Sequence, residues 1–362
     1  MISPLVLSTD QYLVPSLPTI WFGVVLFTLA LYVALDGFDF GIGMLYATRD
    51  EHDRETLLAA FGPVWDANEV WLVAFGTTLL AAFPPIYSRL LSEHYLLAIA
   101  IVMALLFRGV SPELREQRED ERWQRACDRL FVFGSTTTPL LLGMLVGSWI
   151  FGTASLSLPS LLTGVGLVAL SLTSGAAFVA AKTQGSLAAD MVRYGTASTL
   201  AYLGGVVVLL AVVFWTDPVG VRELLLTLPA VAVVLGSVVF GVGGIVLARR
   251  GRHRLWFAST FGLSVLLVGL VARLLYPTIY PASGLTIDAA VVSPLALNLV
   301  TVLGLPVLVL VLWYFKFLYG VFAGPIDETV EGGTSPLPVC SSFLRSAPLI
   351  ISALQQFPLI CR

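Results

Sequence analysis

Nine long apolar stretches divide this 362-residue chain, and they restrict its fold more than any other feature. The hydrocarbon core of a bilayer is about 30 Å thick and takes about 20 residues of helix to cross. Runs of suitable length, bounded by charged, proline or turn residues, lie at residues 17–46, 57–83, 94–110, 130–151, 159–181, 194–215, 224–248, 256–276 and 295–322. We therefore predict an all-α, polytopic membrane protein with nine transmembrane helices.

The composition agrees with a location in lipid. Hydrophobic residues make up 57% of the chain and charged residues only 12%, whereas a soluble domain carries roughly 25% charged residues. The formal net charge of -3, without a basic tract, gives no electrostatic basis for a nucleic-acid partner. Cys127, Cys340 and Cys361 are odd in number and lack a C-x-x-C spacing, so they indicate neither a disulfide framework nor a thiolate metal site.

The distribution of Lys and Arg predicts the orientation, because the loops on the cytoplasmic side carry the excess. With the N-terminus outside, the outer loops contain only Arg89 and Arg222, and the inner loops contain 13 basic residues. These are Arg49, Arg54, Arg115, Arg118, Arg122, Arg125, Arg129, Lys182, Arg193, Arg249, Arg250, Arg252 and Arg254. We predict an outer N-terminus and a cytoplasmic C-terminus.

The chain leaves no room for a separate soluble domain, because its longest polar stretch covers only residues 112–129. We predict that residues 1–331 form a single transmembrane domain, and that its helices form two four-helix bundles plus one peripheral helix. The composition changes at residues 332–362, a C-terminal tail of unknown role that mixes Pro, Ser and Cys with short apolar pieces. Its apolar run at residues 347–360 is too short to span a membrane.

Four carboxylates interrupt the first two apolar stretches: Asp36 and Asp39, then Asp66 and Glu69. A charged Asp near a helix centre costs about 2.5–3.5 kcal/mol on insertion scales, so the four cannot all face lipid. The i, i+3 spacing puts both members of each pair on one helix face. A short connection makes the two helices antiparallel neighbours, so their polar stripes can meet. The pattern predicts a proton-conducting or proton-storing cluster that opens to the cytoplasm.

Other interpretations explain part of this pattern. If Pro63 is the first residue of the second helix, Asp66 and Glu69 occupy its first turns, where the helix dipole favours negative charge. That interpretation does not explain Asp36 and Asp39, which lie near the opposite end of their own helix. Arg108, near the end of the third stretch, could extend to the interface or pair with one of the carboxylates.

Histidine argues against a haem site within this chain. His52 and His253 fall in inner loops and His94 at an outer helix end, so no helix interior offers a pair of histidine ligands. A C-x-x-C-H motif is also absent from the sequence. We predict that the chain by itself binds no redox metal.

Three short segments have distinctive sequences: LDGFDFGIG at residues 35–43, GPVWDANEVWL at 62–72 and AAFP at 81–84. They resemble motifs of subunit II of the cytochrome bd quinol oxidases. FRGV at 107–110, AKTQG at 181–185 and SPL at 293–295 follow in the family's order, so the resemblance covers about residues 17–324. Residues 1–16 and the tail at 332–362 match nothing in the family.

This resemblance implies a function and a partner. Such a subunit contains no haem and supports subunit I, which holds haem b and haem d, in a prokaryotic cell membrane. The complex oxidises quinol, reduces O₂ to water and takes its chemical protons from the cytoplasm. Asp39 and Asp66 match acidic positions of a proton pathway, Asp36 and Glu69 match less closely, and Trp65, Asn68 and Arg108 match neighbouring motif positions. The resemblance also allows small accessory membrane subunits and the structural quinone that some members bind.

Two other functions stay open at this point. A proton-coupled secondary transporter would also use intramembrane carboxylates, although it would need a midplane substrate site, preferably built from both halves of the chain. The carboxylates here lie in the first quarter of the sequence, which disfavours a transporter. A purely structural subunit, whose carboxylates only satisfy buried partners, has the same fold as the proton-guiding subunit and differs from it only in turnover.

Overall fold

The computed structural model describes residues 10–321, and this part of the chain contains helices and no named strand. The all-α prediction is thereby confirmed for these residues. The long helices are α1 (Leu17–Tyr46), α3 (Trp65–Ala82), α5 (Tyr95–Arg115), α6 (Glu121–Phe151), α7 (Leu158–Lys182), α8 (Gly185–Thr216), α10 (Leu228–Arg249), α11 (His253–Leu275) and α13 (Pro294–Val321). Shorter helices are α2 (Glu51–Phe61), α4 (Pro84–Glu93), α9 (Val221–Leu225) and α12 (Ile287–Ala290). The tail at residues 332–362 lies outside the described residues.

Eight of these helices are long and apolar enough to cross a membrane, and the count becomes nine if α3 and α4 form one bent span. The two meet at Phe83 with a bend of 120°. Pro84 and the proline after it begin α4, and a proline ring cannot continue the hydrogen-bond ladder of the preceding helix. The region therefore forms two helices joined by a sharp bend, and not one straight span.

The predicted span at residues 57–83 is wrong at its start. The chain forms α2, breaks over residues 62–64 and restarts as α3 at Trp65. Pro63 lies in this break, and proline lacks the N–H that a continuous helix would need. The first span has the predicted bounds. Helices α6 and α8 begin at Glu121 and Gly185, about nine residues before their predicted starts, and the other spans agree with the prediction to within several residues.

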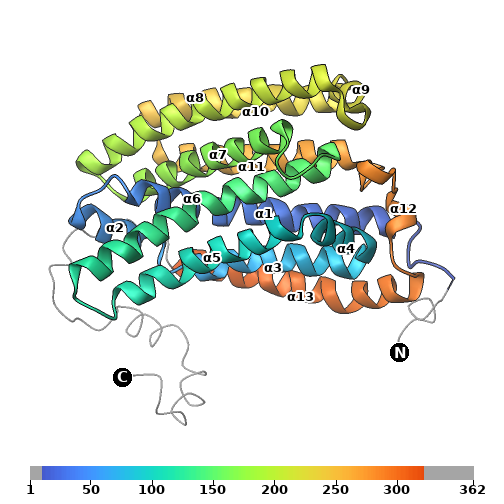
Figure 1. Cartoon of the computed structure of the whole chain (residues 1–362), viewed down its shortest axis with the longest axis horizontal. Coiled ribbons are helices and arrows are strands. Elements are labelled where there is room, and N and C mark those ends of the chain that lie inside the picture. The colour runs from blue at the N-terminus through green and yellow to red at the C-terminus, as the bar shows by residue number, and fades with distance from the viewer. Residues whose placement is uncertain (1–9, 322–362) are drawn as a thin grey trace, which may run out of the picture. The chain divides into compact units, whose positions relative to one another are not determined.

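Helix α1 lies in the interior of the described unit and packs against α3, α6, α7 and α11 (Figure 1). Its contact with α7 is close, because a Cβ at Gly41 would overlap the carbonyl oxygen of Ser171 and would lie 2.9 Å from the Cα of Gly175. Small residues at such crossings allow two membrane helices to approach with little space between their backbones. The C-terminal half of α1, which carries the carboxylates, is therefore packed against protein and does not face lipid.

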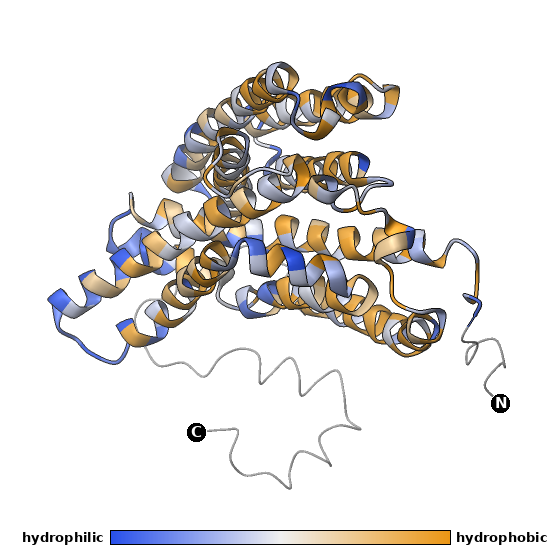
Figure 2. Ribbon diagram, turned by 45° about the vertical axis from the view of Figure 1, so that its right-hand side comes forward, coloured by the Kyte–Doolittle hydropathy of each residue, from blue (hydrophilic) through white to orange (hydrophobic). Residues whose placement is uncertain are grey.

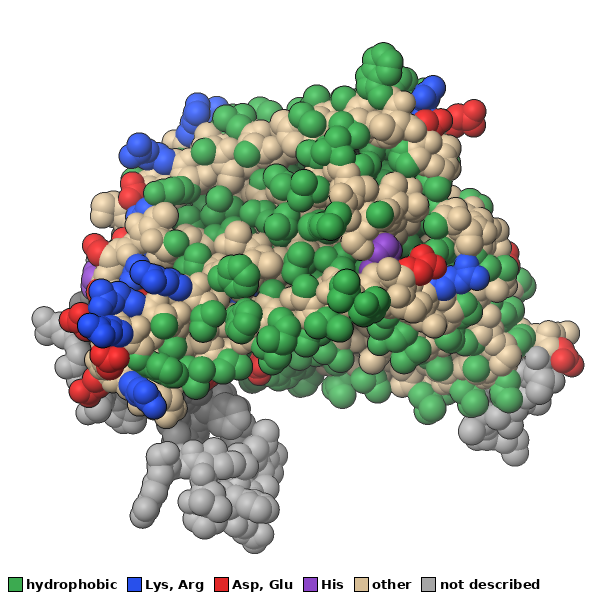
Figure 3. All heavy atoms as spheres, viewed as in Figure 1, with side chains coloured by type: hydrophobic (Ala, Val, Ile, Leu, Met, Phe, Trp, Pro, Cys, Tyr) green, Lys and Arg blue, Asp and Glu red, His purple; other side chains and the backbone are tan. Residues whose placement is uncertain are grey.

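The outer surface has the polarity expected of a membrane protein. Figure 2 shows hydrophobic residues along the long helices and hydrophilic residues gathered near their ends. Helix α13 lies at the periphery, with only 11% of its most apolar window buried. Lys and Arg side chains gather at the end of the unit where α2 and the α5–α6 connection lie (Figures 1 and 3). We call this the α2 end.

Candidate functional site

Asp36 and Asp39 lie on the face of α1 that points into the protein, and both are fully buried. Their i, i+3 spacing gives them a common face, as the helical period requires. Ion pairs and hydrogen bonds from α3, α5 and α13 then complete their surroundings. We call Asp36, Asp39, Asn68, Glu69, Arg108 and Tyr319 the α1 cluster.

Arg108 of α5 supplies the positive charge of the α1 cluster and is itself only 1% exposed. Its Nη2 lies 2.8 Å from Asp36 Oδ1 and 3.8 Å from Asp39 Oδ2, and its Nη1 lies 3.9 Å from Glu69 Oε2. The guanidinium also lies 4.5 Å from the ring centre of Phe40 and 5.9 Å from that of Trp65. Such contacts stabilise a desolvated cation through the negative face of the ring. One guanidinium therefore contacts three carboxylates.

Helix α5 can carry Arg108 to this depth because α6 lets it approach. A Cβ at Gly134 of α6 would lie 2.6 Å from the backbone nitrogen of Arg108, so a larger residue there would push the two helices apart. The short polar connection between α5 and α6 makes the helices antiparallel neighbours. The position of Arg108 is thus fixed by backbone packing.

Asn68 and Tyr319 form a chain of hydrogen bonds that ends on Asp39. Asn68 Nδ2 donates to Asp39 Oδ2 at 2.9 Å, and Tyr319 Oη donates to Asn68 Oδ1 at 2.8 Å. This chain ties α13 to α3 and α1, because Tyr319 lies 251 residues after Asn68. No local motif in the sequence points to Tyr319, since its place beside Asn68 depends only on how α13 packs.

The two carboxylates of α3 have different environments. Glu69 is half-buried, with 29% of its side chain exposed, and reaches Arg108. Asp66 lies in the first turn of α3, is exposed on this chain, and forms no ion pair within residues 10–321. The structure therefore brings Asp36, Asp39 and Glu69 together and leaves Asp66 at the surface.

A pocket of about 210 Å³ reaches the α1 cluster from the α2 end. Its lining includes Arg108 and Trp65 at the inner side, and Glu113 and Glu116 around the last turn of α5. Glu113 and Glu116 are exposed, whereas Arg108 is buried. We call this pocket the vestibule, since it connects exposed carboxylates with the buried arginine.

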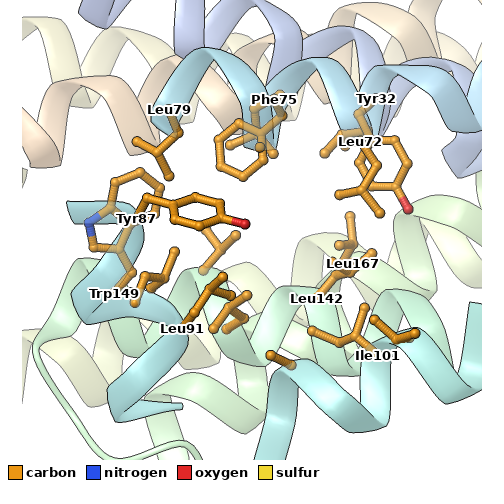
Figure 4. Close-up of a pocket in the computed structure, with 18 of the residues that line it drawn as sticks. Tyr32, Leu72, Phe75, Leu79, Tyr87, Leu91, Ile101, Leu142, Trp149 and Leu167 are labelled. Atoms are coloured by element: carbon orange, nitrogen blue, oxygen red, sulfur yellow. The ribbon is translucent and has the colours of Figure 1, made fainter. Parts of the chain in front are cut away.

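A second, larger cavity of about 510 Å³ is almost entirely apolar. Figure 4 shows the rings of Tyr87, Trp149 and Phe75 at one end of it and that of Tyr32 at the other. Trp149 Nε1 donates to the carbonyl of Ile279 at 2.8 Å, which fixes the indole in the wall. The hydroxyl of Tyr32 has no hydrogen-bond partner within residues 10–321. The cavity is shaped for an apolar molecule with few polar groups.

The fold and the cluster define a class of protein, a multi-pass membrane protein that buries carboxylates around one arginine within its helices. Comparison with known proteins gives the family. Residues 17–322 match the family model described as cytochrome bd terminal oxidase subunit II. The chain belongs to this family.

Relatives and a solved structure agree with this assignment. The chain is 27% identical to cytochrome bd-I ubiquinol oxidase subunit 2 of Escherichia coli strain K12, over 88% of this chain and 97% of the relative. It is 40% identical to cytochrome bd ubiquinol oxidase subunit 2 of Bacillus subtilis strain 168, in a match that covers 36% of this chain and 39% of the relative. A chain in the structure of bd oxidase from Geobacillus thermodenitrificans has the same fold, with a TM-score of 0.73, 17% identity and coverage of 85% of this chain and 99% of that chain.

Family membership makes this chain a multi-pass prokaryotic membrane protein and a subunit of an oxidoreductase complex, and it implies a subunit I partner. Within residues 10–321, no group of three or more His, Cys, Asp or Glu side chains is arranged to hold a metal ion.

Proposed function

We propose that this chain is the non-haem subunit II of a quinol:O₂ oxidoreductase. In this proposal it supports the subunit I that holds haem b and haem d, and it guides cytoplasmic protons through the carboxylates of α1 and α3. Reduction of one O₂ to two waters consumes four protons and four electrons, and two quinols supply the electrons. A subunit without haem can therefore contribute to the reaction by delivering protons.

The observation that carries the proposal is the set of three carboxylates around the buried Arg108, the residue on which the vestibule ends. Exposure decreases along the carboxylates, from exposed Asp66 through half-buried Glu69 to fully buried Asp39. One guanidinium balances only one of the three carboxylates that it contacts, so the others can hold protons at little electrostatic cost. A series of sites that gain and lose protons is what a proton pathway requires. Trp65 and Asn68 position the arginine and Asp39, respectively.

Orientation and bundle arrangement belong to the same proposal. The excess of basic residues at the α2 end supports a cytoplasmic position for that end and for the C-terminus, with the N-terminus outside. Helix α1 packs against α3 and α6, and α6 against α5, whereas α7 packs against α8 and α11, and α10 against α8 and α11. These contacts support two groups of four helices, which meet where α7 packs against α1 and α6. Helix α13 contacts chiefly α3, as expected of a peripheral helix. We also propose that residues 1–331 form a single transmembrane domain.

We further propose that the apolar cavity holds a structural quinone, as in some members of the family. The aliphatic and aromatic walls suit an isoprenoid tail, and the Tyr32 hydroxyl could donate to a quinone oxygen. Leu142→Trp should fill part of the cavity. Mass spectrometry of lipid extracts from the purified complex should then detect less quinone than in wild type, and equal amounts would reject this site.

Asp39→Asn tests the proton pathway. Asparagine keeps the shape and can still accept the hydrogen bond from Asn68, but it cannot exchange a proton. We expect steady-state O₂ consumption with quinol to fall by about tenfold or more, the scale of losing one positioned proton-transfer group. Haem content of the complex should stay unchanged.

Glu223→Gln on α9 is the matched control, because Glu223 is exposed and distant in the chain from the α1 cluster. Proton uptake should be followed with a pH-indicating dye as fully reduced complex reacts with O₂. Slower uptake in Asp39→Asn than in the control supports the pathway. Wild-type turnover and uptake in Asp39→Asn would leave a purely structural role for the cluster.

A further inference from the structure

An open pocket of about 550 Å³ lies at the α2 end, between the end of α1, helix α2 and residues 128–137 of α6. It is separate from the vestibule and is polar on one side and apolar on the other. Arg54 and Arg129 line the polar part, and Phe133 and Thr137 lie further along α6. Arg129 and Thr137 are eight residues apart, which corresponds to about 12 Å along a helix. The pocket thus extends from the interfacial level into the span.

The charge of the polar part is positive by one unit, because Arg54, Arg129 and Asp128 are the charged residues of the lining. Both oxygens of Asp128 are in use: Tyr46 and Arg115 donate to Oδ1 at 2.8 and 2.9 Å, and Arg54 donates to Oδ2 at 3.3 Å. Arg115, outside the lining, is balanced by its pair with Glu51 and leaves the excess unchanged. Arg129 is exposed and forms no ion pair within residues 10–321.

The apolar part shows what kind of anion suits the pocket. Phe133 is 53% exposed although it lies within a helix that is apolar enough to span the membrane. A free phosphate ion would gain nothing from this ring or from the methyl group of Thr137. A phosphodiester with acyl chains would contact both parts, since basic pockets beside transmembrane helices bind anionic headgroups.

We propose that this pocket binds one anionic glycerophospholipid, with its phosphate at Arg54 and Arg129 and an acyl chain along Phe133 and Thr137. A headgroup of one negative charge, as in phosphatidylglycerol, balances the excess of one positive charge. The lipid would lie between α2 and α6. Because Leu58 of α2 lines the vestibule, the lipid would also hold α2 in position beside it.

Native mass spectrometry of the detergent-purified complex can test this proposal, with dioleoylphosphatidylglycerol as the probe. Arg129→Gln removes the unpaired charge, and we expect the dissociation constant of the tightest lipid to rise about tenfold. Arg125→Gln is the matched control on the same helix, since Arg125 is exposed and outside the pocket, paired at 3.8 Å with Glu121. The control should bind as wild type does. Thr137→Trp, which fills the apolar part, should also weaken binding.

The comparison ligands separate a phospholipid from other sources of phosphate. Dioleoylphosphatidylcholine should bind more weakly than dioleoylphosphatidylglycerol. Inorganic phosphate in excess should displace neither of these two lipids. Equal affinity of wild type and Arg129→Gln for phosphatidylglycerol would overturn the proposal, as would displacement by inorganic phosphate, which would indicate a free-anion site. Thermal melting of both arginine variants should match wild type, which excludes misfolding as the cause of any loss.

Discussion

Replacing Arg108 by leucine should destabilise the protein strongly, because it leaves buried carboxylates without their positive partner. Asp36 is fully buried and its carboxylate lies 2.8 Å from the guanidinium. Leucine fills part of the space and keeps the helix, so the main change is the loss of charge. The ring of Phe40, 4.5 Å from the guanidinium carbon, loses its cation as well.

The expected size follows from these contacts. Removing one partner of a buried ion pair costs about 3–5 kcal/mol in the free energy of unfolding. A desolvated cation over an aromatic ring adds about 2 kcal/mol, which the apolar leucine partly offsets. We expect a loss of about 4 kcal/mol, close to a thousandfold change in the unfolding equilibrium.

Unfolding of the purified complex in mixed SDS micelles can measure this loss. Arg273→Leu on α11 is the matched control, because Arg273 is partly exposed and forms no ion pair within residues 10–321. It should change stability by less than about 1 kcal/mol. In the double variant Asp36→Asn with Arg108→Leu, a coupling of about 1–3 kcal/mol should restore part of the loss. A loss below about 1 kcal/mol for Arg108→Leu, or strict additivity in the double variant, would refute the reasoning.

Three further changes test other parts of the structure. Gly41→Val should abolish co-purification with the partner subunit, because the valine Cβ would overlap α7. Gly23→Val is the control and should still assemble with the partner, because no atom lies within 4 Å of a Cβ at Gly23. Equal yields of complex from the two variants would contradict this packing. Tyr319→Phe should lower unfolding stability by about 1 kcal/mol by removing the bond to Asn68, and the exposed Tyr314→Phe should not. Burial lowers the pKa of His94, between α4 and α5, so neutral His94 stabilises the fold above the ordinary histidine pKa and this contribution disappears as pH falls. Melting temperature should therefore fall more from pH 8 to pH 5 in wild type than in His94→Gln, and parallel decreases would show that His94 does not contribute.

The first span could be predicted to the residue, and the second could not, for a physical reason. Residues 17–46 are predominantly apolar, with Asp36 and Asp39 as the charged exceptions, and contain no proline after the first turn, so length and hydropathy define the helix. Around Pro63 the apolar pattern continues while the backbone breaks, and periodicity alone cannot place that break. The bend at Phe83 could not be predicted either, because its angle depends on how α4 packs and not on composition.

Only the part of the site that lies within one helix could be predicted from the sequence. The spacing of Asp36 and Asp39 fixes their common face within one helix. Which charge neutralises them depends on the depth and rotation of α5, which Gly134 helps to set through contact with Arg108. Tyr319 comes from a helix at the other end of the chain. Such contacts depend on how helices distant in the chain pack together, and no pattern in a single sequence predicts that packing.

From the composition of the α1 cluster we infer proton exchange and not a purely structural role. Replacing a buried ion pair by well-packed apolar residues is often neutral or stabilising, so stability alone gives little reason to bury one. A structural cluster would match each acid with a base, yet three carboxylates here surround one arginine. The excess acids must hold protons or face water to avoid the cost of unpaired charge. Glu69 borders the surface and Asp39 does not. In the proposed pathway, a proton that enters at Glu69 passes to Asp39 after Asp39 has released its own proton deeper into the complex.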